Sequence, residues 1–227
     1  SAWWFNAGFN ECYNVGNRGG ESAEMVTPHV LDWLERNGEK DNWMMHVHYW
    51  DPHTPYRTPA DYENHFDGTP LPDDWITEEI FREHLLHIGP HGANEINMWN
   101  DDTFAQWPKH PGKLTSLEDA RHFLNLYDEG IRYTDDNIGQ IIGWLKDHGL
   151  YDDDLAVIIT ADHGEDLGEF GVYGEHGMAD EPVCRIPLII KWPGMQKGTV
   201  AKGFHDNTDL APTVQELLQT PMFMGNR

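Results

Sequence analysis

Apolar residues recur every three or four positions in two long segments, which is the spacing of one face of a helix. In the first segment, Thr27 and Pro28 match an N-cap followed by the first helical residue, and Gly38 marks the end. Ser116 opens the second and longer segment, which Gly149 closes. The regularity of the second segment predicts the strongest helix of the chain.

Two shorter helices are predicted as well. One covers residues 75–88, and the other is capped by Thr208 or Asp209 and directs Leu210 and Val214 toward a core. Both patterns are interrupted more often by polar residues than the long segment after Ser116.

Short apolar runs bounded by turn formers predict three buried strands, in residues 42–49, 154–164 and 185–194. Helices alternate with these strands along the chain. This order predicts an α/β domain with a mainly parallel sheet flanked by helices. In such sheets, ligands bind beyond the carboxyl ends of the strands, so the residues that follow each strand are the first place to look for chemistry.

The 227 residues are expected to form one domain. Residues 60–115 are rich in loops, and a segment of this kind is usually an active-site rim or an insertion. The chain begins at Ser1 without an initiator Met. We therefore expect it to be part of a longer protein.

Charge and cysteine content exclude several functions. Asp and Glu number 39 against 15 Lys and Arg, which gives a net charge of −24, and such a surface repels the phosphates of nucleic acids. No run of about 18 apolar residues exists, so no membrane span is expected. Cys12 and Cys184 match no zinc-binding spacing, and the sequence does not show whether they pair. It does not show the oligomeric state or the compartment of the protein either.

Asp162 and His163 directly follow the second predicted strand, in the sequence ITADHG. A carboxylate and an imidazole at this place could hold one divalent cation, with further ligands from elsewhere in the protein. The carboxylate favours Ca²⁺, Mg²⁺ or Mn²⁺, and the imidazole moves the preference toward Mn²⁺ or Zn²⁺. The alternative is structural, with Asp162 capping the turn and His163 satisfied within it.

Two more histidines lie after strand ends. His53 follows the first predicted strand in a loop stiffened by Pro52 and Pro55, and His176 lies in the sequence YGEHG. Either residue alone could have a purely structural role. Together with the Asp162–His163 pair they suggest a shared site at one edge of the sheet.

Three blocks of the sequence, HYWDPHTPYRTP, ITADHGEDLGEFGVYGEHG and CRIPLIIKWPG, together resemble the sulfatase family of the alkaline phosphatase superfamily. The closing TDLAPTVQELL fits as well. The resemblance covers most of the chain and is weakest in residues 60–115. It implies an alkaline phosphatase/sulfatase-like fold.

The resemblance also implies roles for four residues. In the family, one divalent cation, usually Ca²⁺, binds the sulfate beside a formylglycine nucleophile. Asp162 and His163 match the metal ligands, and His53 matches a residue that contacts the sulfate and can stabilise the charge of the ester or assist the leaving oxygen. His176 lies where the family often has a charged sulfate-binding residue. The chain departs from the family after GEHG, where many relatives have Lys and this chain has the sequence MADE.

The nucleophile implied by the resemblance is missing from these residues. Formylglycine arises in a Cys/Ser-x-Pro-x-Arg motif, and neither Cys12 nor Cys184 lies in one. We expect that motif and further metal ligands upstream, and a C-terminal subdomain downstream. Residues 1–227 are then an incomplete catalytic domain that is inactive alone.

The sequence thus predicts a sulfatase that cleaves a small-molecule or saccharide sulfate ester. One alternative is a phosphonate or phosphate mono- or diesterase of the same superfamily, which would use the same cation platform. Another is a noncatalytic carbohydrate-binding module. Four Trp side chains could flank a sugar ring, although packing is the competing explanation: Trp50, Trp75, Trp99 and Trp107.

Overall fold

The computed structural model describes residues 7–16, 20–72, 75–96, 111–151 and 154–220. Five helices and four strands lie in these ranges, so the α/β composition expected from the sequence is present. In chain order they are α1 Ala23–Asn37, α2 Glu78–His84, α3 Leu117–Asp147, β1 Val157–Thr160, β2 Asp166–Leu167, β3 Tyr173–Glu175, α4 Glu181–Cys184, β4 Leu188–Lys191 and α5 Asn207–Leu217.

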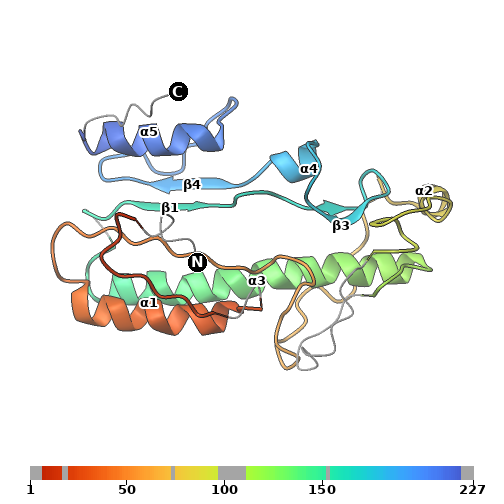
Figure 1. The fold of residues 1–227 in the computed structure, drawn as a ribbon, viewed down its shortest axis with the longest axis horizontal. Helices are drawn as coiled ribbons and strands as arrows, with labels where there is room; N and C mark the ends of the chain where they lie inside the picture. Colours follow the sequence, from red (N-terminus) through yellow and green to blue (C-terminus); the bar gives the residue numbers. More distant parts are fainter. Residues whose placement is uncertain (1–6, 17–19, 73–74, 97–110, 152–153, 221–227) are drawn as a thin grey trace.

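The helix predicted after Ser116 is confirmed as α3. The Ser116 side chain accepts a hydrogen bond from the Asp119 N–H, and the Asp119 carboxylate accepts one from the Ser116 N–H, which together form a capping box. The C-terminal half of α3 packs on α1 around Val30, Leu34 and Leu145. This pair of helices forms the base of the molecule in Figure 1.

Helix α1 begins five residues earlier than the sequence predicts, with Ser22 rather than Thr27 at the N-cap. The cause is a tertiary contact, because the Ala23 N–H donates to the buried Asp51 carboxylate at 2.6 Å. That contact satisfies a first-turn N–H, and Pro28 then lies inside the helix. Similarly, α5 is capped by Asp206, two or three residues before the predicted caps.

Strand pairing differs from the mainly parallel sheet that the sequence predicts. Within the described ranges, β1 pairs with β4 and β2 with β3, and both pairs are antiparallel. Val157 lies opposite Lys191, and Thr160 lies opposite Leu188. A parallel pair needs a crossover connection of a dozen or more residues, usually helical. Between β1 and β4 the chain forms loops, the β2–β3 pair and only the four residues of α4, and it returns antiparallel.

The strand predicted for residues 42–49 is extended but is not assigned as a strand, because no described segment forms a ladder with it. Its side chains still alternate as in a strand. Trp43, Met45 and Val47 pack against the α1–α3 cluster, whereas Met44 is 72% exposed. The apolar pattern therefore predicts which side chains of this segment face inward. It does not predict whether another segment pairs with its backbone.

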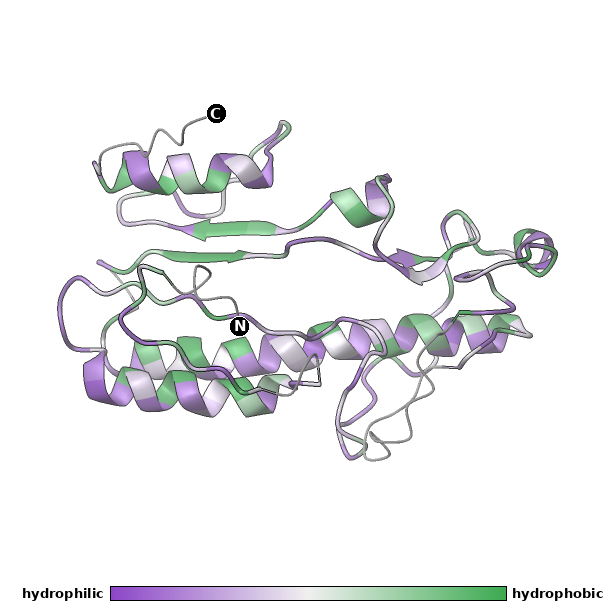
Figure 2. Cartoon of the chain, viewed as in Figure 1, coloured by the Kyte–Doolittle hydropathy of each residue, from purple (hydrophilic) through white to green (hydrophobic). Residues whose placement is uncertain are grey.

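The elements are arranged in layers in Figure 1, where the β1–β4 pair lies between the α1–α3 pair and α5. Figure 2 shows that β1 and β4 are mainly apolar, each ending in one polar residue, Thr160 and Lys191, whereas α3 alternates between apolar and polar stripes. None of the described residues of α5 is buried. No described helix has both the length and the apolarity that crossing a membrane requires.

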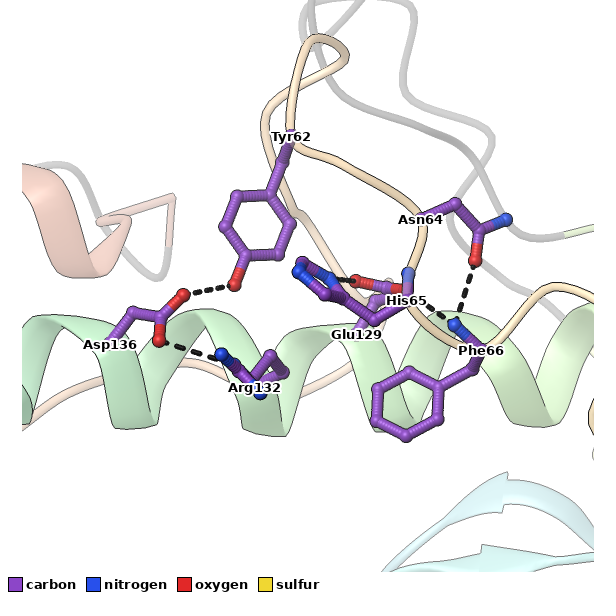
Figure 3. Close-up of polar contacts among 7 residues, drawn as sticks. All are labelled: Tyr62, Asn64, His65, Phe66, Glu129, Arg132 and Asp136. Atoms are coloured by element: carbon purple, nitrogen blue, oxygen red, sulfur yellow. Dashed lines mark hydrogen bonds and ion pairs between the residues drawn. The ribbon is translucent and has the colours of Figure 1, made fainter.

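The described part of the 60–115 region contains only α2 and turns, which agrees with its loop-rich prediction. Its first loop is fixed to α3 by polar contacts (Figure 3). The buried Glu129 carboxylate accepts the N–H groups of His65 and Phe66, and the Tyr62 hydroxyl donates to Asp136 at 2.5 Å. Other described residues of the region, among them Ile76, Phe81 and Leu114, close a second core around Phe123 on the N-terminal half of α3.

Candidate functional site

Three half-buried histidines from three separate loops converge at one place. His53, His163 and His176 each offer one ring nitrogen, and these atoms lie within 4.8 Å of one another. The His163 and His176 rings stack with centroids 4.4 Å apart, and the His53 ring lies 4.7 Å from His176 and 6.0 Å from His163. We call these three residues the histidine cluster.

His53 is held by the loop that follows the extended segment 42–49. Its Nδ1 atom lies 2.8 Å from the Thr54 carbonyl oxygen, and its ring stacks on Trp50 at a centroid distance of 4.6 Å. The neighbouring Asp51 carboxylate anchors this loop to the start of α1 through the Ala23 N–H. The His53 ring is therefore fixed from two sides before anything binds.

His163 follows β1, and its turn is kept tight by Gly164. The Gly164 N–H donates to the Val183 carbonyl at 2.7 Å, and a Cβ atom on Gly164 would lie 2.1 Å from the Pro182 carbonyl oxygen. The His163 Nδ1 atom lies 2.8 Å from the Gly164 carbonyl. Only glycine allows α4 to approach the turn this closely.

The carbonyl contacts define which nitrogen carries a proton in two of the rings. A carbonyl oxygen only accepts hydrogen bonds, so the Nδ1 atoms of His53 and His163 are the donors. In the neutral ring, Nε2 is then left with a free lone pair. Histidines that bind metals are usually held in this way, by a carbonyl or carboxylate on the second nitrogen.

His176 follows β3 and is surrounded by carboxylates. Glu175 accepts the N–H groups of His176 and Gly177 at 2.8 and 2.6 Å, and its other oxygen lies 2.9 Å from Nε2 of His91. The Glu165 carboxylate lies 3.5 Å from the His176 Nδ1 atom. Glu175 thus fixes the backbone of His176, and the buried Glu165 carboxylate lies beside the His176 ring.

Burial dominates the electrostatics of the cluster. Burial lowers the pKa of His53 and of His176, and the neighbouring histidines lower each pKa further, so the neutral rings are favoured. Burial, with the nearby charges of Glu175 and Asp166, raises the pKa of Glu165 to about 8.

Glu175 behaves differently from Glu165. Burial alone would raise its pKa, but the N–H groups of Gly177 and His176 and the His91 ring outweigh that effect and hold the pKa below its ordinary value. Glu175 is therefore an ionised carboxylate at neutral pH.

The structure places Asp162 beside the cluster rather than among the three imidazoles. Its side chain is 78% exposed, and its Oδ1 atom lies 3.8 Å from Nε2 of His163. Oδ1 also accepts the His163 N–H at 3.1 Å. The pair therefore presents one carboxylate oxygen and one imidazole nitrogen to the same space, next to His53 and His176.

Two other residues of the sequence blocks and loops discussed above have a structural role. Asp180 caps α4 by accepting the Val183 N–H, and Trp75 packs against the second core. Cys12 and Cys184 are both free and exposed, so they do not pair. Trp99 and Trp107 lie outside the described residues.

Sequence reasoning assigned no role to three residues around the cluster. Glu165 and Glu175 lie inside the recognised block, directly after DHG and directly before His176, so proximity to those motifs was an available signal. His91 lies in the loop-rich region, and nothing in the sequence places its ring against Glu175.

The arrangement can do two kinds of chemistry. Three imidazole nitrogens within 4.8 Å, with a carboxylate nearby, can hold a divalent metal ion. The same rings, once protonated, can bind an anion and transfer a proton to it. Both activities occur in enzymes that break ester bonds of tetrahedral oxyanions.

Comparison with known proteins agrees with this chemistry. Residues 3–220 match the family model described as Sulfatase. The chain is 29% identical over 209 residues to the multifunctional alkaline phosphatase superfamily protein PehA of Trinickia caryophylli, an alignment that covers 90% of this chain and 40% of PehA. It is 24% identical over 228 residues to the choline-sulfatase of Rhizobium meliloti (strain 1021), covering 95% of this chain and 41% of that enzyme.

A solved structure shares the fold. The phosphonate monoester hydrolase SpPMH from Silicibacter pomeroyi superposes with a TM-score of 0.60 at 25% identity, over 88% of this chain and 39% of that one. The chain thus spans about two fifths of the length of PehA and of the choline-sulfatase. Because the family model covers nearly all of its residues, the chain belongs to the sulfatase family of the alkaline phosphatase superfamily.

Proposed function

We propose that this chain supplies the substrate- and metal-binding half of an enzyme that hydrolyses sulfate esters with the help of one divalent cation. The observation that carries the proposal is the convergence of His53, His163 and His176 beside the Asp162 carboxylate. The similarity to choline-sulfatase supports the choice of a sulfate ester.

Asp162 and His163 would hold the cation. Their Oδ1 and Nε2 atoms are 3.8 Å apart, a separation that ligands of one ion can have when each bond is about 2.0–2.6 Å long. Ca²⁺ fits the carboxylate best, with Mn²⁺ and Mg²⁺ as alternatives, and it needs additional oxygen ligands. A bound divalent cation withdraws electron density from the ester oxygens and neutralises negative charge. Zn²⁺ on the three imidazoles is the competing arrangement.

His53 and His176 would bind the charged end of the ester. An anion next to these rings favours their protonated forms, because an opposite charge nearby raises the pKa of an imidazole. The Thr54 carbonyl holds the Nδ1 proton of His53, so the second proton resides on Nε2. From there it can pass to the leaving alcohol oxygen as the S–O bond breaks.

The attacking group in this proposal is a formylglycine. No Cys/Ser-x-Pro-x-Arg motif occurs in the 227 residues, so we place the formylglycine upstream of them. The substrate class is a small-molecule or saccharide sulfate ester. Trp50, which is 36% exposed and stacks on His53, offers an aromatic surface beside the cluster for such a substrate.

The test is hydrolysis of an aryl sulfate by the intact protein that contains this chain. The His53→Ala variant should lower turnover by about 10²–10⁴-fold, the usual contribution of a general acid. His122→Ala is the matched control, because His122 is exposed on α3 away from the cluster. Unchanged turnover in His53→Ala would remove His53 from the reaction.

A second candidate is hydrolysis of phosphonate or phosphate esters, which the similarity to PehA and to SpPMH favours. The same residues would then contact phosphorus oxyanions. Turnover of matched aryl sulfate and aryl phosphonate esters, compared as kcat/KM in one preparation, distinguishes the two. The proposal requires the sulfate to be preferred, and a preference for the phosphonate would replace it with the second candidate.

A further inference from the structure

His91, from the loop-rich region, is connected to the histidine cluster through Glu175. Its ring lies against Glu175 at 2.9 Å, and Glu175 in turn holds the backbone of His176. A side chain from a loop far away in the sequence therefore reaches the cluster through a single intermediate residue.

The backbone of His91 is fixed on both sides. The His91 N–H donates to the Glu95 carbonyl at 2.7 Å, and the His91 carbonyl accepts the Tyr173 N–H at 2.7 Å. Gly92 and Glu95 also form an isolated bridge, which closes this turn. The turn is thus hydrogen-bonded directly to β3, the strand that leads into His176.

The contact between His91 and Glu175 is a close polar contact, in which Nε2 of His91 lies 2.9 Å from Oε2 of Glu175. The other oxygen, Oε1, accepts from both His176 and Gly177. The two oxygens of the Glu175 carboxylate thus contact different groups. Rotation of the carboxylate would break its contact with His91 and its hydrogen bonds from the 176–177 backbone.

The position of Glu175 determines where the His176 ring lies. His176 Nδ1 has no hydrogen bond among the described residues, and its nearest carboxylate oxygen, on Glu165, is 3.5 Å away. The ring is therefore oriented mainly by its backbone and by stacking on His163. A shift of the 175–177 backbone would move the ring directly.

We propose that His91 is a positioning residue that sets the orientation of His176 by holding Glu175. It touches neither the ester nor the cation in this arrangement. Its influence on turnover rests on the proposed function, but its influence on the His176 ring does not. Partners of this kind typically change activity by about 10–100-fold when they are removed.

The test compares two variants of similar side-chain length in the intact protein. His91→Gln keeps an N–H donor at a reach similar to that of Nε2, whereas His91→Met removes the donor. We expect the long-range ¹H–¹⁵N spectrum of the His176 ring, assigned by its loss in His176→Asn, to match the wild type in His91→Gln and to shift or broaden in His91→Met. Turnover of an aryl sulfate should fall about 10–100-fold, mainly in kcat, in His91→Met alone.

Two results would overturn the proposal. One is an unchanged His176 spectrum in His91→Met. The other is an equal loss of turnover in both variants, which would show that the polar contact with Glu175 does not account for the effect of His91. If His91→Met does not fold, His91→Gly replaces it, because the φ angle of His91 is 62° and glycine adopts that conformation without strain.

The ring spectrum and the turnover measurement test different claims, so the failure of this proposal can be told apart from the failure of the proposed function. If the wild type shows no sulfate ester turnover, the proposed function fails. The ring spectrum still decides whether His91 positions His176.

Discussion

Replacing Glu129 by Gln tests how the loop after His53 is held on α3 (Figure 3). Glu129 is 5% exposed, and one of its oxygens accepts the N–H groups of both His65 and Phe66. Its second oxygen lies 3.3 Å from Nδ1 of His65. The substitution keeps the shape and one oxygen acceptor but removes the negative charge.

The expected loss follows from the number of hydrogen bonds. A bond to a charged acceptor contributes about 1.5–3 kcal/mol and a neutral one about 0.5–1.5 kcal/mol, so two bonds lose about 2 kcal/mol in total. Because 1.4 kcal/mol is tenfold in an equilibrium constant, the loop should open about 30 times more often.

Hydrogen–deuterium exchange of the peptide covering residues 60–67, read by mass spectrometry, measures this opening. We expect exchange about 30-fold faster in Glu129→Gln than in the wild type. Glu118→Gln is the matched control, since Glu118 is exposed on the same helix and pairs with Arg121. This variant should change exchange less than twofold, about the effect of an exposed ion pair. Equal exchange in Glu129→Gln and the wild type would refute the role of the buried carboxylate.

Three further substitutions test local features. Gly164→Ala should destabilise the protein by about 1–3 kcal/mol, because the new Cβ would meet the Pro182 carbonyl oxygen at 2.1 Å, and an unchanged midpoint of thermal unfolding would contradict the close approach. Ser116→Ala removes half of the capping box with Asp119 and should lower the free energy of unfolding by about 1 kcal/mol in urea; no change would mean that the cap is dispensable. Burial lowers the pKa of His84 below its ordinary value of 6.5, so the contribution of this residue to stability is complete above that pH and is lost as the pH falls toward the lowered pKa. His84→Asn should therefore lose less stability than the wild type between pH 7.5 and 5.5, and an identical loss would exclude this residue as a cause.

The sequence predicts the elements better than their connections. The helix after Ser116 is defined by its own cap and its own apolar period, both of which are local. The start of α1 depends on Asp51, which lies 28 residues from Ala23 in the chain, and no local signal reveals it. The direction of β4 relative to β1 likewise depends on how the intervening loops return the chain.

Prediction of the site shows the same difference between local signals and long-range contacts. His53 and His163 do lie near each other, with ring centroids 6.0 Å apart. The rule that ligands gather at the carboxyl ends of strands assumes a parallel sheet, whereas β1 and β4 are antiparallel and residues 42–49 form no ladder with a described segment. The rule says nothing of the contacts that hold the rings, such as the Thr54 carbonyl on His53 or the Glu175 carboxylate beside His176. Those contacts come from backbone paths that the residue pattern does not encode.

The most direct test of the central claim is the Ca²⁺ dependence of aryl sulfate turnover by the intact protein, measured after chelation in the wild type and in Asp162→Asn. We predict that chelation abolishes turnover in the wild type, that Ca²⁺ restores it, and that the variant needs at least about tenfold more Ca²⁺ for the same rate. Turnover that survives chelation, or an equal Ca²⁺ requirement in the two proteins, would contradict a cation held by Asp162 beside the histidine cluster.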